Sequence, residues 1–160
     1  MILKTFELQK INKINAKYFL FYGQNEGLKR KAIKENFSEN FSGEIQRFDE
    51  NEILNNLNYF ISNLMNKSFF EEKKLILISR VSEKSLKIIE EILEKNIKDI
   101  IIVLNSGNLD KKSKLRNFFE KNKEIICTPF YSDEARTLSL LAINFFKLKK
   151  IPISQENINL

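Results

Sequence analysis

The segment from Gly23 to Arg30 has the spacing of a phosphate-binding loop but not its full set of residues. Such a loop reads G-x-x-x-x-G-K-[ST], with its amides and lysine on the phosphates and its hydroxyl on magnesium. Aligned from Gly23, Lys29 takes the lysine position, while Leu28 replaces the second glycine and Arg30 the hydroxyl residue. Leucine would crowd the amides that approach phosphate, and Arg30 offers no metal ligand. The pattern predicts a degenerate loop that does not hydrolyse ATP.

The remaining parts of a hydrolysis site are also missing. A magnesium-binding Asp is expected at the end of a central strand, but two apolar runs are followed by Ser79-Arg80 and Asn105-Ser106. The chain has no His, which excludes imidazole bases and His metal sites. We therefore expect neither a cofactor nor a metal. A second interpretation stays open, in which Gly23 is only a tight strand-to-helix turn without nucleotide ancestry.

Two aromatic residues, Phe69 and Phe70, follow Ser68 in the polar stretch between a predicted helix and a predicted strand. Buried rings dominate the energy of many interfaces, so aromatic side chains in a polar loop are candidate anchors for a partner. The chain has fourteen Phe residues, and the alternative is that both rings fold back onto the core.

Five short apolar runs provide the elements that would position these residues: Tyr18–Tyr22, Ile45–Phe48, Leu75–Ile78, Ile100–Leu104 and Ile125–Cys127. Three of them are continuous rather than alternating, as strands buried on both faces of a parallel sheet require. Amphipathic helical patterns separate the runs. This alternation predicts an α/β fold with a doubly wound parallel sheet. Ligands of such sheets bind at the carboxyl ends of strands, where Gly23 opens its turn.

Four amphipathic patterns predict helices between the strands. Their apolar residues recur at three- and four-residue spacing: Leu28, Ala32 and Ile33; Ile53, Leu57, Phe60, Ile61 and Leu64; Leu86, Ile89 and Leu93; and Leu115, Phe118 and Phe119. Asn25, Ser82 and Asp110 precede the first, third and fourth patterns, and we predict that they are N-caps.

After Pro129 the pattern is helical only. A long amphipathic segment follows Ser132, a predicted N-cap, and another helix is expected to begin at Ser154. We therefore expect an α/β domain over residues 1–130. Residues 131–160 are expected to begin a second, helical domain that is cut short.

Composition narrows the class of protein. The formal net charge of +6 and a pI of about 9.3 suit a nucleic-acid partner, but the basic residues are spread along the chain rather than gathered in one stripe. The single cysteine, Cys127, lies in an apolar run, which predicts a buried thiol. No stretch is apolar and long enough to span a membrane, and no signal core is found, so we expect a cytoplasmic protein.

In order along the chain, these segments resemble the N-terminal part of the delta-subunit family of bacterial DNA polymerase III. The resemblance covers nearly the whole chain. It is carried by the stretches 18–28, 68–70 with 74–78, 101–116 and 127–133.

The resemblance implies an AAA+-like fold of the P-loop NTPase type, with a nucleotide site that does not work and a helical lid that is only begun. It implies that Ser68, Phe69 and Phe70 match the family's Ser-Leu-Phe element, with Phe69 in place of leucine. In that family the apolar pair inserts into a pocket on the beta sliding clamp.

The function implied is that of a clamp-loader subunit of the DNA polymerase III holoenzyme, a DNA-directed DNA polymerase and nucleotidyltransferase. It would bind and open the clamp in DNA replication without hydrolysing ATP itself. The implied partners are the clamp, the other clamp-loader subunits, which assemble largely through a collar domain absent here, and DNA indirectly.

Two other functions stay open on the residues alone. One is a divergent P-loop nucleotide-binding phosphotransferase, whose ATP turnover would depend on Lys29. The other is a nucleic-acid-binding α/β module, whose binding to duplex DNA would weaken steeply with salt.

Overall fold

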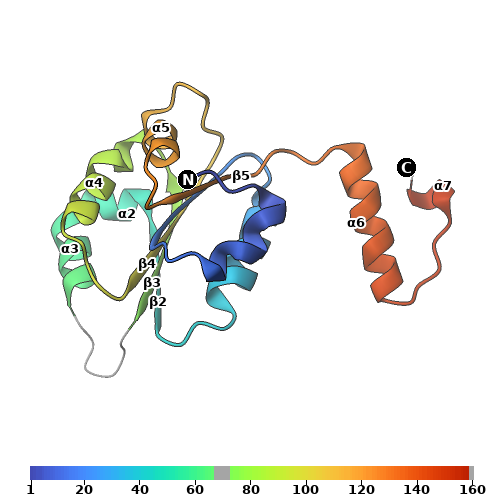
Figure 1. The fold of residues 1–160 in the computed structure, drawn as a ribbon, viewed down its shortest axis with the longest axis horizontal. Coiled ribbons are helices and arrows are strands. Elements are labelled where there is room, and N and C mark those ends of the chain that lie inside the picture. The colour runs from blue at the N-terminus through green and yellow to red at the C-terminus, as the bar shows by residue number, and fades with distance from the viewer. Residues whose placement is uncertain (67–72, 159–160) are drawn as a thin grey trace. The chain divides into compact units, whose positions relative to one another are not determined.

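The computed structural model describes residues 1–66 and 73–158 of the chain (Figure 1). Five parallel strands form one sheet in the order β2-β3-β4-β1-β5. They are β1 (Tyr18–Tyr22), β2 (Glu44–Asp49), β3 (Lys74–Val81), β4 (Ile100–Ser106) and β5 (Ile126–Pro129). The predicted α/β fold with a doubly wound parallel sheet is confirmed.

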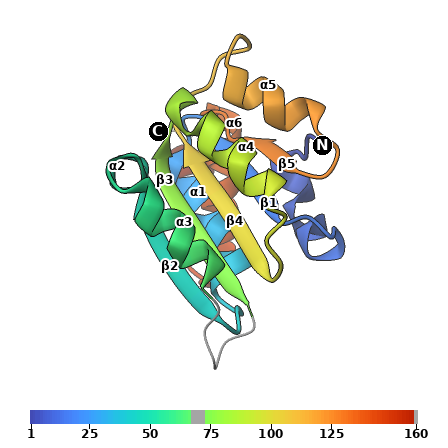
Figure 2. The same ribbon diagram turned by 90° about the vertical axis from the view of Figure 1, so that its left-hand side faces the viewer.

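Helices cover both faces of the sheet, and each face has its own apolar cluster. One face carries α2 (Glu50–Asn55), α3 (Leu57–Met65), α4 (Leu86–Glu94) and α5 (Lys114–Lys121), with the short 3-10 helix η3 (Glu83–Ser85) before α4. The other face carries the 3-10 helix η1 (Thr5–Lys13), α1 (Glu26–Ile33) and the π-helical turn η2 (Lys34–Ser38). Figure 2 shows α3 and α4 in front of the strands, on the first of these two faces.

The interior strand β1, which lies between β4 and β5, is apolar at every position. Successive side chains of a strand point to opposite faces, and both faces are covered here. Phe19 and Phe21 enter the cluster under α1, where the ring of Phe19 meets that of Phe37 edge-on at 4.8 Å. The alternate residues enter the cluster under α4 and α5: Tyr18, Leu20 and Tyr22.

The predicted helix around residues 53–64 is two helices. The helix is interrupted at Asn56, whose backbone is not helical, with φ −145° and ψ 65°. Its side chain accepts a hydrogen bond from Tyr59 N at 3.2 Å and so caps α3. The break lets the apolar side chains of both helices, among them Ile53 and Phe60, reach the same cluster.

The predicted N-caps are confirmed in part. Asn25 caps α1, and Ser82 caps the turn η3 that leads into α4. Asp110 is wrong as the cap of α5, because its carboxylate accepts from Lys112 N in the preceding loop. The cap is Ser113, which accepts from Arg116 N at 3.1 Å.

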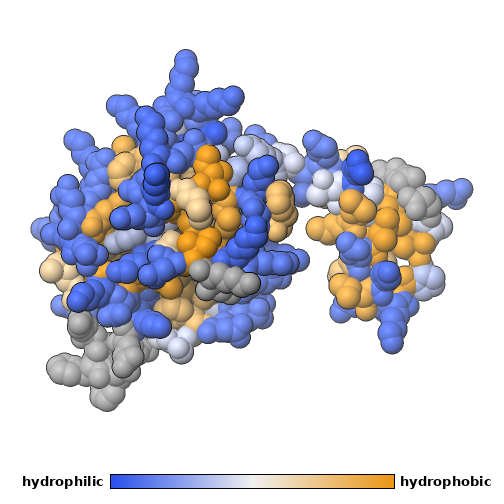
Figure 3. Space-filling model, viewed as in Figure 1, coloured by the Kyte–Doolittle hydropathy of each residue, from blue (hydrophilic) through white to orange (hydrophobic). Residues whose placement is uncertain are grey.

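The chain divides into two compact units at the bond between Phe130 and Tyr131. The second contains α6 (Ala135–Leu148) and α7 (Gln155–Ile158). Glu134 is the N-cap residue of α6, so the prediction of Ser132 is wrong. No residue of α6 is buried, and Figure 3 shows apolar side chains on the surface of this unit. That this unit begins a helical lid stays a prediction.

None of the described helices has both the length and the hydropathy needed to cross a membrane.

Candidate functional site

The turn after β1 is built around Gly23, which has a φ of +124°. A Cβ atom on this residue would lie 2.1 Å from the carbonyl oxygen of Phe130 at the end of β5. Gly23 N donates to Gly107 O at 2.9 Å, and Phe130 N donates to Tyr22 O at 2.7 Å. Glycine is therefore required both by the backbone conformation and by the close approach of β5.

The amides of this turn are already bonded within the chain. A phosphate loop needs several amides that point at the ligand. Here Asn25 N donates to Phe130 O, Glu26 N to Gln24 O, and Leu28 N to the side-chain oxygen of Asn25. These three amides therefore donate within the chain rather than toward a phosphate.

Lys29 stands in the lysine position, but its side chain is turned into the protein. The residue is 1% exposed. Its ammonium donates to Ser106 O at the end of β4 at 2.6 Å and lies 2.9 Å from the carboxylate of Glu26. A cation that is buried and bonded in this way holds α1 to the sheet and is not presented to a phosphate.

The other two replaced positions also have structural roles. Leu28 is half-buried and packs against the apolar cluster under α1, so it does not fill the turn as the sequence suggested. The Arg30 side chain is 79% exposed and its Nε donates to Glu26 at 3.2 Å. The residues predicted as a degenerate loop, Gly23, Leu28, Lys29 and Arg30, thus form a packed turn and helix start.

Glu26 connects this turn to the end of β4. Its carboxylate accepts from Lys29, Arg30 and Asn105, the last at 2.9 Å. Desolvation raises the pKa of Glu26, but these hydrogen bonds outweigh it, and the net pKa lies below the ordinary value. Asn105 Oδ1 is buried and has no hydrogen-bond partner among residues 1–66 and 73–158.

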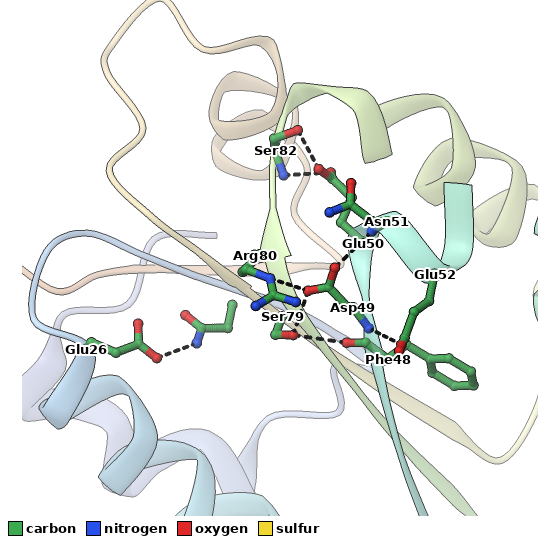
Figure 4. A network of polar contacts seen from close by, with 10 residues as sticks. Glu26, Phe48, Asp49, Glu50, Asn51, Glu52, Ser79, Arg80 and Ser82 are labelled. Atoms are coloured by element: carbon green, nitrogen blue, oxygen red, sulfur yellow. Dashed lines mark hydrogen bonds and ion pairs between the residues drawn. The ribbon is translucent and has the colours of Figure 1, made fainter. Parts of the chain in front are cut away.

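Sequence reasoning missed a charged network at the carboxyl ends of β2 and β3 (Figure 4). Asp49 ends β2 and pairs through Oδ2 with Arg80 Nε at 2.6 Å, while Ser79 donates to the same oxygen. The hydrogen bond from Arg80 lowers the pKa of Asp49. Asp49 and Glu52 form a capping box, and this D-x-x-E spacing was the available sequence signal. The Asp49 carboxylate is thus bonded within the chain, to Arg80 and Ser79.

The neighbouring Glu50 is buried, and its carboxylate accepts three hydrogen bonds. It accepts from Ser82 N at 2.7 Å, from Ser82 Oγ at 2.7 Å and from Ser85 Oγ at 2.6 Å. Three donors to one carboxylate satisfy its charge without a cation. Across the described residues, no three metal-ligating side chains come together as a cluster.

The predicted clamp-binding residues Ser68, Phe69 and Phe70 lie outside the described residues. Their role stays a prediction. Cys127 is fully buried, as predicted, and burial raises the pKa of its thiol to about 12.

The sequence matches no protein-family model and no curated protein. The structure is similar to domain III of the replication initiation protein DnaA from Thermotoga maritima, with a TM-score of 0.50, 13% identity, and 97% of this chain and 72% of that one covered. It is also similar to a replication initiator DnaA bound to AMPPCP and single-stranded DNA, with a TM-score of 0.57, 16% identity, and 94% and 52% covered. The fold is that of an AAA+ domain.

At these identities the similarity shows the fold alone. The chain spans about half the length of the second of these structures. Within the AAA+ fold, the turn at Gly23 occupies the place of the phosphate loop, and Ser79-Arg80 and Asn105-Ser106 stand at the ends of β3 and β4. Among the described residues, the turn at Gly23 thus differs from a phosphate loop at Leu28 and Arg30, and neither Ser79-Arg80 nor Asn105-Ser106 includes a carboxylate.

Proposed function

We propose that this chain is a clamp-loader subunit of the delta type, which contacts the sliding clamp and leaves ATP hydrolysis to neighbouring subunits. The observation that carries the proposal is the buried ammonium of Lys29, bonded to Ser106 O and Glu26. A subunit that does not turn over nucleotide can use this lysine to fasten α1 to the sheet. The AAA+ fold and the ordered sequence resemblance support the same assignment.

The contact with the clamp is assigned to Ser68, Phe69 and Phe70. Two aromatic rings that enter an apolar pocket would act as hot spots, because they bury large area with little loss of side-chain freedom. The other loader subunits would bind and hydrolyse ATP, and DNA would be contacted through the assembly.

The similar solved structures are replication initiators, and one of them was bound to AMPPCP and single-stranded DNA. Nucleotide binding is not part of the function proposed for this chain. The bonded amides of Asn25, Glu26 and Leu28 and the buried Lys29 argue against it.

The clamp contact is tested by changing Phe69 and Phe70 together to Ala and measuring binding to the bacterial beta sliding clamp by surface plasmon resonance. We expect affinity to fall on the order of 1000-fold, since two aromatic hot spots contribute about 2 kcal/mol each. Phe6→Ala is the matched control, because this ring is 75% exposed and belongs to η1. Undiminished clamp binding by the double variant would sink the assignment.

A titration with Mg-ATP distinguishes the clamp-loader subunit from the alternative, a P-loop phosphotransferase. We expect no saturable binding and no turnover by the wild-type chain. Turnover that disappears in Lys29→Ala, measured at a temperature where this variant is folded, would favour the enzyme over the clamp-loader subunit.

A further inference from the structure

A cleft of about 540 Å³ opens on the face of the sheet that carries η1 and η2, at the amino ends of the strands. Its volume is typical of ligand-binding pockets in proteins. Its floor is apolar and consists of the buried side chains of Ile11, Phe19 and Phe37. The turn at Gly23 lies at the opposite, carboxyl ends of the strands, so the cleft is a separate site.

One wall of the cleft is the π-helical turn η2, which follows α1 directly and lies beside η1 (Figure 1). The turn is closed by Glu39 N, which donates to Lys34 O at 2.9 Å. π-Helical turns are rare in proteins and occur frequently at functional sites. Within this turn, Asn36 Nδ2 donates to Ala32 O at 2.9 Å, which orients the amide and leaves its oxygen as an acceptor.

A tight turn between η1 and β1 holds Asn15 at the cleft. Ile14 N donates to Ile11 O at 3.0 Å, and Ala16 N donates to Ile14 O at 2.9 Å. Asn15 stands between these two bonded residues and is exposed. Because the backbone on both sides of Asn15 is already bonded, less entropy is lost when this residue meets a ligand.

The ring of Phe41 forms a further part of the wall. It lies against Gly43, whose φ is +150°, and a Cβ on that residue would lie 2.9 Å from Phe41 Cε1 and 2.4 Å from Lys73 O. Lys73 O also accepts from Glu44 N at 3.1 Å. Glycine is therefore required where the ring and the chain entering β3 approach this backbone.

Amide side chains supply most of the polar groups of the cleft. Those of Asn15, Asn36 and Asn40 line it. An amide side chain offers donors and an acceptor, the same groups that a peptide bond presents. An extended peptide can therefore bond to these side chains while one of its apolar residues covers the floor.

The charges at the cleft also restrict the ligand. Lys73 is exposed, and within residues 1–66 and 73–158 its ammonium forms no ion pair. Glu35, the other charged residue described in the lining, faces Lys31 at 3.8 Å. One available cation suits a single carboxylate. It is too little charge for a nucleic acid, whose binding depends on neutralising several phosphates.

We propose that this cleft binds an extended segment of a partner protein. An aliphatic or aromatic side chain of the segment covers the floor at Phe19 and Phe37, its main chain bonds to the three asparagines, and an acidic residue pairs with Lys73. This site goes beyond the proposed clamp contact and does not depend on it.

The experiment selects binders from a phage-displayed library of random peptides on the immobilised chain. Selected peptides are synthesised with a fluorescent label, and their Kd is measured by anisotropy for the wild type, Asn40→Ala and Lys73→Glu. The matched controls are Asn58→Ala, on α3 over the other face, and Lys98→Glu, ahead of β4; both positions are exposed.

We expect the selected peptides to share an apolar and an acidic residue. Asn40→Ala should raise Kd about tenfold, because a hydrogen bond to the peptide is lost. Lys73→Glu should also raise it about tenfold, and replacing the acidic residue of the peptide with Lys should recover most of this loss. The two controls should leave Kd unchanged.

The inference is overturned if no peptide is enriched, or if the selected peptides bind Asn40→Ala and Lys73→Glu as tightly as the wild type. A peptide with Lys in place of its acidic residue that fails to recover affinity for Lys73→Glu would refute the pairing with Lys73. Titration with labelled oligo(dT) is the second probe, and binding that Asn40→Ala weakens would assign the cleft to nucleic acid instead. None of these measurements uses the clamp, so the inference and the proposed function fail separately.

Discussion

Replacing Lys29 with Met tests whether this lysine stabilises the fold or binds phosphate. Methionine keeps most of the unbranched stem but removes the ammonium that donates to Ser106 O at 2.6 Å. In a nucleotide site this change would abolish ligand binding with little effect on the empty protein. In the arrangement described here it should weaken the protein itself, since two acceptors on different elements lose their donor.

The size of the loss follows from the two contacts. A buried hydrogen bond to a charged group contributes about 1.5–3 kcal/mol. The ion pair adds less than about 1 kcal/mol, because the Glu26 side chain is 45% exposed and also binds Arg30. Part of the sum is offset because an ammonium no longer has to be buried. We expect a net loss of about 2–3 kcal/mol, which lowers Tm by roughly 5–10 °C in a chain of this size.

The assay is urea unfolding followed by circular dichroism, with Mg-ATP titration of the same samples by calorimetry. Lys31→Met is the control, because that side chain is 63% exposed and lies 3.8 Å from Glu35 in the adjoining turn η2. It should change stability by less than about 0.5 kcal/mol. The reasoning is refuted if Lys29→Met is as stable as the control, or if the wild type binds Mg-ATP and this variant does not.

Two further changes probe the same turn. Gly23→Ala should cost at least about 3 kcal/mol in urea unfolding, since its Cβ would collide with Phe130 O. Gly27→Ala should stabilise by roughly 0.5–1 kcal/mol, because it lies in α1 and its Cβ would meet only the side-chain oxygen of Asn25, at 3.9 Å; equal effects at the two glycines would contradict this account. The lowered pKa of Glu26 means that its contribution is present above the ordinary value of 4.5 and is lost as pH falls through the folded value. The stability difference between wild type and Glu26→Gln should therefore shrink below about pH 4.5, and a difference that grows there would contradict the prediction.

The sheet could be predicted from the sequence because its signal is local. Continuous apolar runs such as Tyr18–Tyr22 need cover on both faces, and the helices between them provide it. The interruption of the helix at Asn56 was not predicted, since the apolar spacing continues across it. Only the hydrogen bond from Tyr59 N to the Asn56 side chain reveals it. The N-terminal helix η1 was missed as well, because its apolar residues Leu8 and Ile11 sit among charged ones.

The site was harder to predict, because its contacts join residues distant in sequence. The alignment placed Lys29 correctly in the lysine position, but the acceptor of its ammonium is Ser106, 77 residues later. The ion pair of Asp49 and Arg80 forms because β2 lies beside β3, and local sequence patterns do not predict the order of strands in a sheet. Spacing can thus locate a loop, while the partners of its side chains emerge only from the fold.

The bonded amides of the turn after Gly23 also bear on timing. A loop that alternates between empty and nucleotide-bound states can set the timing of a catalytic cycle, because the bound state lasts until the nucleotide leaves. Here the backbone amides of Asn25, Glu26 and Leu28 donate to acceptors of the chain itself. Under the proposed function, the first unit would not change state with nucleotide, and the order of events in the assembly would be set by its neighbours.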